Sequence, residues 1–128
     1  MDDQYLIDTN ILIYYLNDMI PENHVEKVES ILRESFNIST ITKIELLGWK
    51  KIPEEDINRI TQFIQPAKIF YIDNQIESKS IELKQNNNLK TPDTIIAATA
   101  LMYNFTLVTR NEDDFKKIKE LKVYNPFS

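Results

Sequence analysis

Tyr5-Leu6-Ile7-Asp8-Thr9-Asn10 is the stretch from which the fold can be worked out. The apolar run before Asp8 is short and bounded, as expected of a buried strand. Thr9 and Asn10 are typical helix-start residues, and the apolar segment 11–16 that follows can be helical. Asp8 is therefore predicted where a strand ends and a helix begins, the place where open parallel α/β sheets bind ligands. Capping of the following helix is an equally good interpretation of Asp8 from this stretch alone.

The composition fits one domain that spans residues 1–128 and does not enter a membrane. The chain has 128 residues, 42% of them hydrophobic, and one glycine, so a single core without a flexible linker is expected. No apolar run approaches the roughly 20 residues that cross a bilayer. The acidic start, Met1-Asp2-Asp3, lacks the basic region of a secretory signal. With no cysteine for a disulfide framework, we expect a cytoplasmic protein.

The charge balance limits the class of partner. Twenty acidic and 15 basic residues give a net charge of −5, whereas a protein that coats nucleic acid normally has a basic surface. A nuclease that gathers its acids in one site is still compatible with this charge. Two divalent ions bound in such a site would bring the chain close to neutrality and reduce its repulsion of a polyanion.

Strand-like and helix-like segments alternate along the rest of the chain. Apolar positions spaced by three or four residues predict helices, and short β-branched or aromatic runs predict strands. The predicted helices cover residues 25–35, 41–49, 53–65, 76–83 and 92–101, and the predicted strands cover 36–39, 69–72, 106–109 and 123–124. Such alternation implies an α/β fold with a parallel sheet and right-handed crossovers.

Local signals predict where several helices begin. Thr40 or Thr42 can cap the helix that follows residue 39, and Thr42 and Glu45 also have the spacing of a capping box. Thr91 fits an N-cap, with Pro92 as the first helical residue and Asp93 as the second. Pro53 is likewise expected to open a helix, after the break at Gly48.

Acidic residues recur at the predicted junctions. Because the strand-to-helix junctions of a parallel sheet share one edge, these acids can converge although they are far apart in sequence. Each has a simpler interpretation as a cap, a partner of a helix dipole or a solvated loop charge. Asp114 precedes Phe115, whose ring could enter the core and thereby fix the Asp114 carboxylate in place. The acids concerned are Asp8, Glu45, Asp93 and the pair Asp113 and Asp114.

A cluster of carboxylates favours a hard divalent cation. Four unpaired carboxylates in one cleft repel one another, and a bound cation removes that repulsion. Oxygen ligands suit Mg²⁺ or Mn²⁺. Zinc is disfavoured, because the chain has no cysteine and a single histidine, His24, which is expected to be solvated or to cap a helix.

Four ordered motifs resemble those of the PIN-domain ribonucleases. They are Leu6-Ile7-Asp8-Thr9-Asn10, Thr42-x-x-Glu45, Pro92-Asp93-Thr94-Ile95-Ile96-Ala97-Ala98-Thr99-Ala100 and Val108-Thr109-Arg110-Asn111-x-x-Asp114-Phe115. The resemblance covers nearly the whole chain and is greatest to the small toxin nucleases of VapBC-type toxin–antitoxin systems. It implies a single PIN-like domain with a five-stranded parallel sheet of order 3-2-1-4-5 flanked by helices. It also implies Mg²⁺- or Mn²⁺-dependent endoribonuclease activity.

The resemblance assigns roles to residues of this chain. Asp8, Glu45 and Asp93 match the three constant acids of the family, as metal ligands and catalytic residues. Asp114 is chosen as the fourth, although many members carry an acid where Asn111 stands, and Asp113 is the neighbouring alternative. The orienting groups would be Thr9, Asn10, Thr109 and Asn111. The basic residues beside the acids could contact RNA, although solvated surface charge is as good an interpretation of them; they are Lys43, Lys90 and Arg110.

The resemblance also implies partners. The substrate would be RNA, a small antitoxin protein would lie over the active-site groove, and a homodimer is expected by analogy. Two helices that begin at the proposed acids supply apolar side chains that could receive an amphipathic partner helix: Tyr14, Tyr15, Leu16, Leu46, Leu47 and Trp49.

Two alternatives to a nuclease remain. A phosphotransfer domain of the receiver or haloacid-dehalogenase kind would use Asp8 as nucleophile, but Asn10 stands where the dehalogenase pattern needs a second Asp. A catalytically inactive PIN-like binding module is disfavoured because all the candidate acids are present. Neither the RNA that would be cut nor the number of metal ions can be inferred from the sequence.

Overall fold

A five-stranded parallel sheet forms the centre of the molecule. The computed structural model describes residues 3–50 and 52–128. The strands are β1 (Tyr5–Ile7), β2 (Asn37–Ser39), β3 (Lys68–Phe70), β4 (Thr106–Val108) and β5 (Val123–Tyr124). Their spatial order, β3-β2-β1-β4-β5, is the predicted one. In the centre, Leu6 of β1 pairs with Asn37 on one side and with Leu107 on the other.

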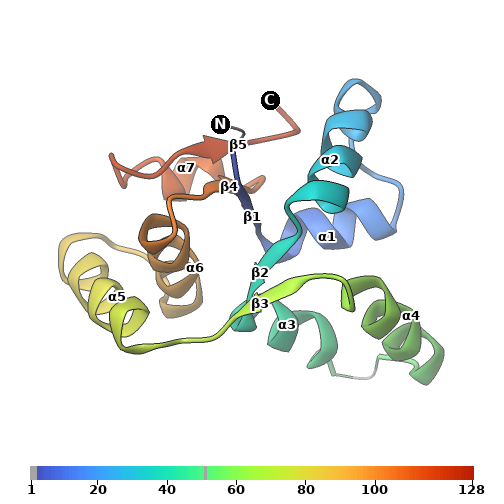
Figure 1. Ribbon diagram of the computed structural model, residues 1–128, viewed down its shortest axis with the longest axis horizontal. Helices are drawn as coiled ribbons and strands as arrows, with labels where there is room; N and C mark the ends of the chain where they lie inside the picture. The colour runs from blue at the N-terminus through green and yellow to red at the C-terminus, as the bar shows by residue number, and fades with distance from the viewer. Residues whose placement is uncertain (1–2, 51) are drawn as a thin grey trace.

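Helices cover both faces of this sheet (Figure 1). They are α1 (Thr9–Leu16), α2 (Glu22–Glu34), α3 (Thr40–Leu47), α4 (Glu54–Ile64), α5 (Asn74–Asn86), α6 (Thr91–Met102) and α7 (Glu112–Phe115). α5 and α6 lie on one side, and α1, α2 and α4 on the other. None of the helices within the described part of the chain is long and apolar enough to span a membrane.

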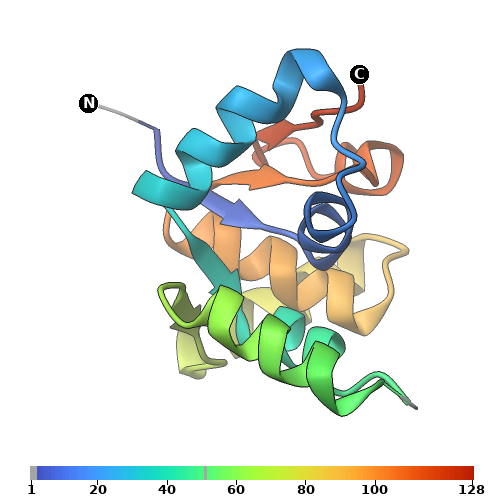
Figure 2. The ribbon, with the colours of Figure 1, turned by 90° about the vertical axis from the view of Figure 1, so that its right-hand side faces the viewer.

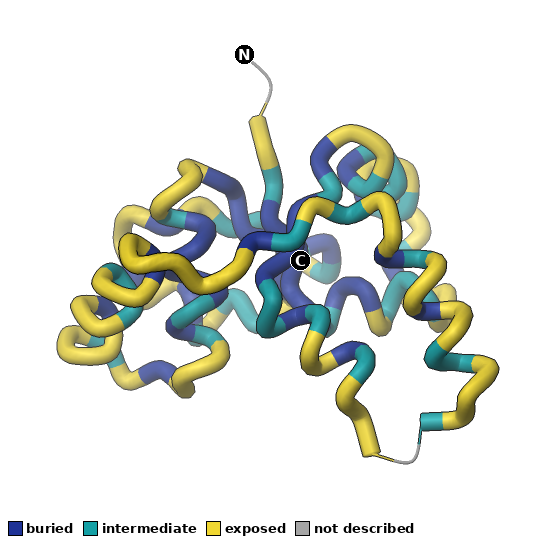
Figure 3. The backbone as a smooth tube through the Cα atoms, turned by 60° about the horizontal axis from the view of Figure 1, so that its bottom comes forward, coloured by how far each residue is buried: buried dark blue, intermediate teal, exposed yellow. Residues whose placement is uncertain are grey.

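The alternation of side chains along β1 and β4 divides the core in two. Leu6 and Leu107 belong to a cluster with the apolar residues of α5 and α6. Ile7 and Val108, the next residue of each strand, pack instead against α1, α2 and α4. Successive strand residues point to opposite faces, so both faces of these central strands are covered by helices. Figure 3 shows most of the buried residues toward the centre of the molecule and most of the exposed residues along its outer helices and loops.

Helix α6 is buried on most sides, as its run of small apolar residues predicts. Ile96, Ala97, Ala98 and Ala100 are all buried, and so are Thr94 and Thr99. The buried Thr99 hydroxyl has a hydrogen-bond partner, because it donates to the Ile95 carbonyl at 2.8 Å. The burial of α6 fixes the position of Asp93 near its N-terminus.

The predicted helix starts were wrong by one or more residues. Ser39, the last residue of β2, caps α3 by accepting from the Ile41 backbone N–H at 3.0 Å. Thr42 is therefore inside the helix and fully buried, and the predicted capping box with Glu45 does not form. In these cases the end of the preceding strand or loop, and not the strongest local cap signal, sets where the helix begins.

The helix starts at the two prolines also differ from the predicted ones by one residue, in opposite directions. α6 begins at Thr91 with Lys90 in the cap position, so Asp93 is its third residue and not its second. Pro53 occupies the cap position of α4 and precedes its first helical residue. Proline suits both places because it has no backbone N–H to leave unpaired.

Other boundaries also differ from those predicted. α2 begins at Glu22, earlier than the predicted start at residue 25, because its exposed first turn carries no apolar signal. β3 ends at Phe70, and the apolar Tyr71 and Ile72 beyond it are exposed. His24 is neither solvated nor a cap: it is half-buried on α2, with Nδ1 2.7 Å from the Tyr124 hydroxyl.

Candidate active site

β1 runs directly into α1 (Figure 2). Asp8 lies at this junction, and it is both a helix cap and a buried carboxylate. Its Oδ1 accepts from the Thr9 backbone N–H at 2.8 Å. Its Oδ2 accepts from the Thr109 hydroxyl, at the end of β4, also at 2.8 Å. Only 6% of Asp8 is exposed, yet no ion pair with a basic side chain is found for it among residues 3–50 and 52–128.

The surroundings of Asp8 oppose its negative charge. Burial raises the pKa of Asp8 to about 6, against the lowering effect of the hydrogen bonds from Thr109 and Thr9. The nearby carboxylates of Asp93 and Glu45 raise it further. A buried acid with a raised pKa and acidic neighbours is typical of a functional site, because a structural role alone would favour a neutral residue.

Glu45 reaches the same place from α3. The Thr9 hydroxyl donates to Glu45 Oε1 at 2.6 Å and lies 3.1 Å from the Thr42 hydroxyl. Thr9 thereby joins the first turn of α1 to α3. Thr9 was predicted to orient the acids, and Glu45 is the acid that its hydroxyl contacts. Thr42 was predicted only as a helix cap, and its contact with Thr9 was not expected.

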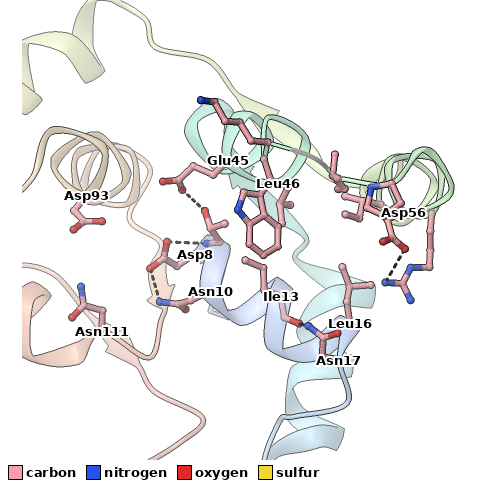
Figure 4. A pocket seen from close by; sticks show the side chains of 17 residues that line it. Asp8, Asn10, Ile13, Leu16, Asn17, Glu45, Leu46, Asp56, Asp93 and Asn111 are labelled. Carbon is pink, nitrogen blue, oxygen red and sulfur yellow. Dashed lines mark hydrogen bonds and ion pairs between the residues drawn. The ribbon is translucent and has the colours of Figure 1, made fainter.

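Asp93 comes from the other side of the sheet, on the first turn of α6 (Figure 4). It is half-buried, and burial raises its pKa, followed by the charges of Asp114 and Glu45. Lys90 acts in the opposite direction. The positive end of the α6 dipole also favours a carboxylate at this position.

These acids share one open cavity of about 680 Å³. Asp8, Glu45, Asp93 and Asn111 line one end of it, and Figure 4 shows their side chains around a common space. The predicted convergence of three acids from three elements is thus found in the structure. The other end is mostly apolar and is lined by Ile13, Leu16, Leu46, Trp49, Ile52 and Ile60.

Two neighbouring residues, Asn111 and Asp114, compete for the role of fourth ligand. Asn111 lines the cavity, and its Nδ2 donates to Asp114 Oδ2 at 3.0 Å. Asp114 is half-buried beside the fully buried Phe115, whereas the side chain of Asp113 is 90% exposed and pairs with Lys116. Asp114 is close enough to raise the pKa of Asp93. The choice of Asp114 as the fourth ligand therefore stays a prediction, with Asn111 between it and the cavity.

The three predicted RNA contacts are placed differently. Arg110 is exposed and its guanidinium carbon lies 4.3 Å from the centre of the Phe127 ring and 5.0 Å from that of Tyr14. Lys90 is exposed and electrostatically coupled to Asp93, and Lys43 is half-buried on α3. The aromatic support of Arg110 was missed from the sequence, where the only signal was the aromatic residue in the C-terminal Asn125-Pro126-Phe127.

The donor set suits a hard cation. Asp8, Glu45 and Asp93 offer only oxygen, the donor atom that Mg²⁺ and Mn²⁺ prefer. As the side chains stand, no group of three or more His, Cys, Asp or Glu within residues 3–50 and 52–128 is arranged to hold a metal ion. Joint ligation therefore requires Glu45 and Asp93 to move toward Asp8, and both are less buried than Asp8. Their mutual repulsion disfavours that closer arrangement unless a cation is present.

Comparison with known proteins identifies the family to which the chain belongs. The family model described as "PIN domain" matches residues 5–121, so the chain belongs to the PIN-domain family. Within that family it is similar to the ribonuclease VapC2 of Rickettsia felis, with 28% identity over 94% of this chain and 96% of the relative.

Two solved structures share the fold over nearly the whole chain. A toxin–antitoxin complex from Klebsiella pneumoniae has 32% sequence identity and a TM-score of 0.75, covering 96% of this chain and 98% of that one. The VapBC2 complex of Rickettsia felis, bound to a DNA fragment of its promoter, has 27% identity and a TM-score of 0.78, with coverage of 94% and 97%. The chain is thus a PIN domain of the VapC kind, as its motifs predicted.

Proposed function

We propose that this protein is a divalent-metal-dependent endoribonuclease and the toxin of a type II toxin–antitoxin system. The observation that carries the proposal is Asp8, a buried carboxylate with a raised pKa that shares a cavity with Glu45 and Asp93. The ribonuclease names of the VapC relatives support the choice of RNA. Membership of the PIN-domain family removes the phosphotransfer alternative, which required a different family.

Asp8, Glu45 and Asp93 would hold the metal ion, with Asp114 completing the set. When bound, Mg²⁺ or Mn²⁺ would lower the pKa of a water molecule and stabilise charge on the phosphate oxygens. The raised pKa of Asp8 means that its anionic form is costly in the free protein, so a cation would be favoured there.

The surrounding polar residues hold these acids in position. Thr109 and the Thr9 backbone N–H fix the two oxygens of Asp8, and the Thr9 hydroxyl fixes Glu45. The amide of Asn10 lies 3.4 Å from Asp8 Oδ2, a weak contact that limits the rotation of the carboxylate. Their role is to orient the acids before substrate arrives.

The apolar end of the cavity suits an antitoxin segment. Trp49 is 70% exposed, and Ile13, Leu16 and Ile60 lie beside it in the cavity wall. Of the apolar residues expected to form this surface, Leu46 is buried and the others except Trp49 are half-buried. An amphipathic helix could bury this wall. The cavity continues to the acids, so a partner seated there would also exclude RNA. A homodimer stays part of the proposal by analogy only.

The test is cleavage of RNA by the purified protein after chelation of metal and after addition of Mg²⁺ or Mn²⁺. Cleavage should require the added ion. Asp8→Asn and Asp93→Asn should each abolish it, and Asp113→Asn, an exposed acid on α7, is the matched control. Cleavage that persists in the presence of EDTA would contradict the proposal. A chain that never cleaves but still binds RNA would be the inactive PIN-like module.

The biological role is tested separately by expression with and without the adjacent small gene product. Growth arrest by the chain alone, relieved by co-expression, supports a toxin. A chain that is harmless alone and forms no complex with any neighbouring gene product contradicts it.

A further inference from the structure

Arg110 is a cation held in place by two aromatic rings. Its guanidinium carbon lies over Phe127 and Tyr14, whose ring centres are 4.9 Å apart. Its backbone N–H points to Asn10 Oδ1 at 3.4 Å, and it stands between Thr109, the hydrogen-bond donor to Asp8, and the cavity-lining Asn111. The side chain therefore has a defined place, on a residue whose two sequence neighbours belong to the site.

The platform under Arg110 is itself built by the C-terminal segment. The Phe127 backbone N–H donates to Asn125 Oδ1 at 2.9 Å, and Asn125 Nδ2 donates to Glu112 Oε1 at 3.2 Å. The Tyr14 ring comes from α1, the helix that Asp8 caps. Two segments more than 100 positions apart thus fix one arginine, which an ordinary solvated surface charge does not require.

The guanidinium has donors to spare. It carries five N–H groups, and its contacts with the two rings are cation–π contacts and not hydrogen bonds to oxygen. Within residues 3–50 and 52–128, no hydrogen bond or ion pair to its guanidinium is found, although Asp8, Glu45 and Asp93 lie in the neighbouring cavity. An arginine without a carboxylate partner beside an acidic cluster is available for an external anion.

We propose that Arg110, positioned by the Tyr14–Phe127 pair, binds a backbone phosphate of the RNA and seats the strand against the acids. This inference rests on the proposed function and adds a specific substrate contact to it. Phosphate recognition by arginine is charge-assisted and often bidentate, and the aromatic platform lowers the entropy lost when the side chain is ordered. It also supplies local positive charge to a chain whose net charge is −5.

The binding test uses a single-stranded oligoribonucleotide and the Asp8→Asn protein without divalent ions, so that nothing is cut. Arg110→Gln should weaken binding about tenfold, and the slope of log affinity against log salt should shrink by about 0.7, the loss of one phosphate contact to a single strand. Lys119→Gln, which removes an exposed charge that is neither in the cavity lining nor over an aromatic ring, is the matched control. Equal affinity and equal slope for the two variants would overturn the proposal.

The platform is tested by removing a ring and keeping the charge. Phe127→Ala should weaken binding about threefold with an unchanged salt slope, because the cation remains but is no longer held. Adding Phe127→Ala to Arg110→Gln should cause no further loss, since the ring acts only through the arginine. Additive losses would overturn the positioning role of Phe127. Thermal unfolding verifies folding, and Tyr14→Leu replaces Phe127→Ala if that variant fails to fold.

Cleavage kinetics separate this inference from the proposed function. In the wild-type background Arg110→Gln should raise KM about tenfold with a small effect on kcat, and Arg110→Lys should recover only part of the loss because lysine lacks the planar fork. A wild-type protein that does not cleave RNA contradicts the proposed function but leaves the binding result standing. A wild-type protein that cleaves RNA with an unchanged KM in Arg110→Gln contradicts the inference alone.

Discussion

The Thr9 hydroxyl donates to Glu45 Oε1 at 2.6 Å, and this contact links α1 to α3 across 36 positions of sequence. Thr9 follows Asp8 directly, and its backbone N–H also binds the Asp8 carboxylate. A single buried threonine therefore orients two of the three acids that share the cavity. Its conformation is fixed by burial, since only 8% of it is exposed.

Thr9→Val should uncouple Glu45 from Asp8. The replacement keeps the shape of the side chain and removes the donor, so RNA cleavage should fall about tenfold while the free energy of unfolding falls by about 1 kcal/mol. Thr61→Val is the matched control, because the Thr61 hydroxyl on α4 bonds only to the Ile57 carbonyl. Initial cleavage rates and chemical denaturation measure the two effects. An equal loss of activity in both variants would contradict an orienting role for Thr9.

The metal-free protein should lose stability as pH rises from about 4 to about 6. The pKa of Asp8 is 3.8 when unfolded and about 6 when folded, so in this range the folded state binds more protons than the unfolded state. Above pH 6 the penalty is complete and amounts to about 3 kcal/mol. Asp93 acts in the same direction, because its pKa is also raised. The measurement is denaturation in EDTA at a series of pH values.

Asp8→Asn tests the origin of that pH dependence. Asparagine keeps an oxygen acceptor but cannot carry the charge, so the variant should be more stable than the wild type at pH 7 and flatter between pH 4 and 6. Asp113→Asn should leave the wild-type profile unchanged, since its side chain is exposed. If the stability of Asp8→Asn depended on pH as that of the wild type does, another residue would be the titrating group.

Asp114→Asn should lose far more activity than Asp113→Asn. Asp114 accepts from Asn111, raises the pKa of Asp93 and has a long ion pair with Lys117 at 3.9 Å. Asp113 instead pairs with Lys116 at 3.1 Å in solvent. An exposed ion pair of that kind contributes about 1 kcal/mol or less. Cleavage rates at saturating Mg²⁺ make the comparison. The reverse order would show that the α7 turn presents the other carboxylate.

Phe115→Ala should unfold or strongly destabilise the chain. Phe115 is fully buried, and truncating a buried phenylalanine leaves a cavity that costs about 3–5 kcal/mol. Tyr71→Ala is the matched control, since Tyr71 is 63% exposed and its loss should change stability by about 0.5 kcal/mol or less. Thermal denaturation measures both. A small effect of Phe115→Ala would mean that the anchor of the α7 turn lies elsewhere.

The parts of the site that were predictable from sequence are those carried by local patterns. The bounded apolar run before Asp8 and the small-residue helix after Asp93 each place an acid at an element boundary, and both placements were confirmed. The strand order came from resemblance and not from periodicity. Helix starts were less predictable. The cap of α3 is Ser39, because β2 ends there, whereas the spacing of Thr42 and Glu45 favoured a later start.

Contacts between distant segments could not be predicted from local patterns. His24 meets Tyr124 across 100 positions, and Arg110 meets Tyr14 and Phe127 from two different parts of the chain. Neither pairing has a local signal, because each depends on how the sheet brings its strands together. The chain positions of the acids were visible in the sequence, whereas the polar and aromatic residues that hold the site were found only in the folded molecule.

The central place of β1 has a consequence for the order in which the molecule is made. Asp8 is synthesised before the other acids of the site, yet the hydroxyl that holds it belongs to Thr109, 101 positions later. β1 gains its second neighbour only when β4 is available, and β4 in turn pairs with β5. Such long-range pairing is slow to form. A growing chain on the ribosome therefore carries Asp8 without an assembled site until β4 has been made.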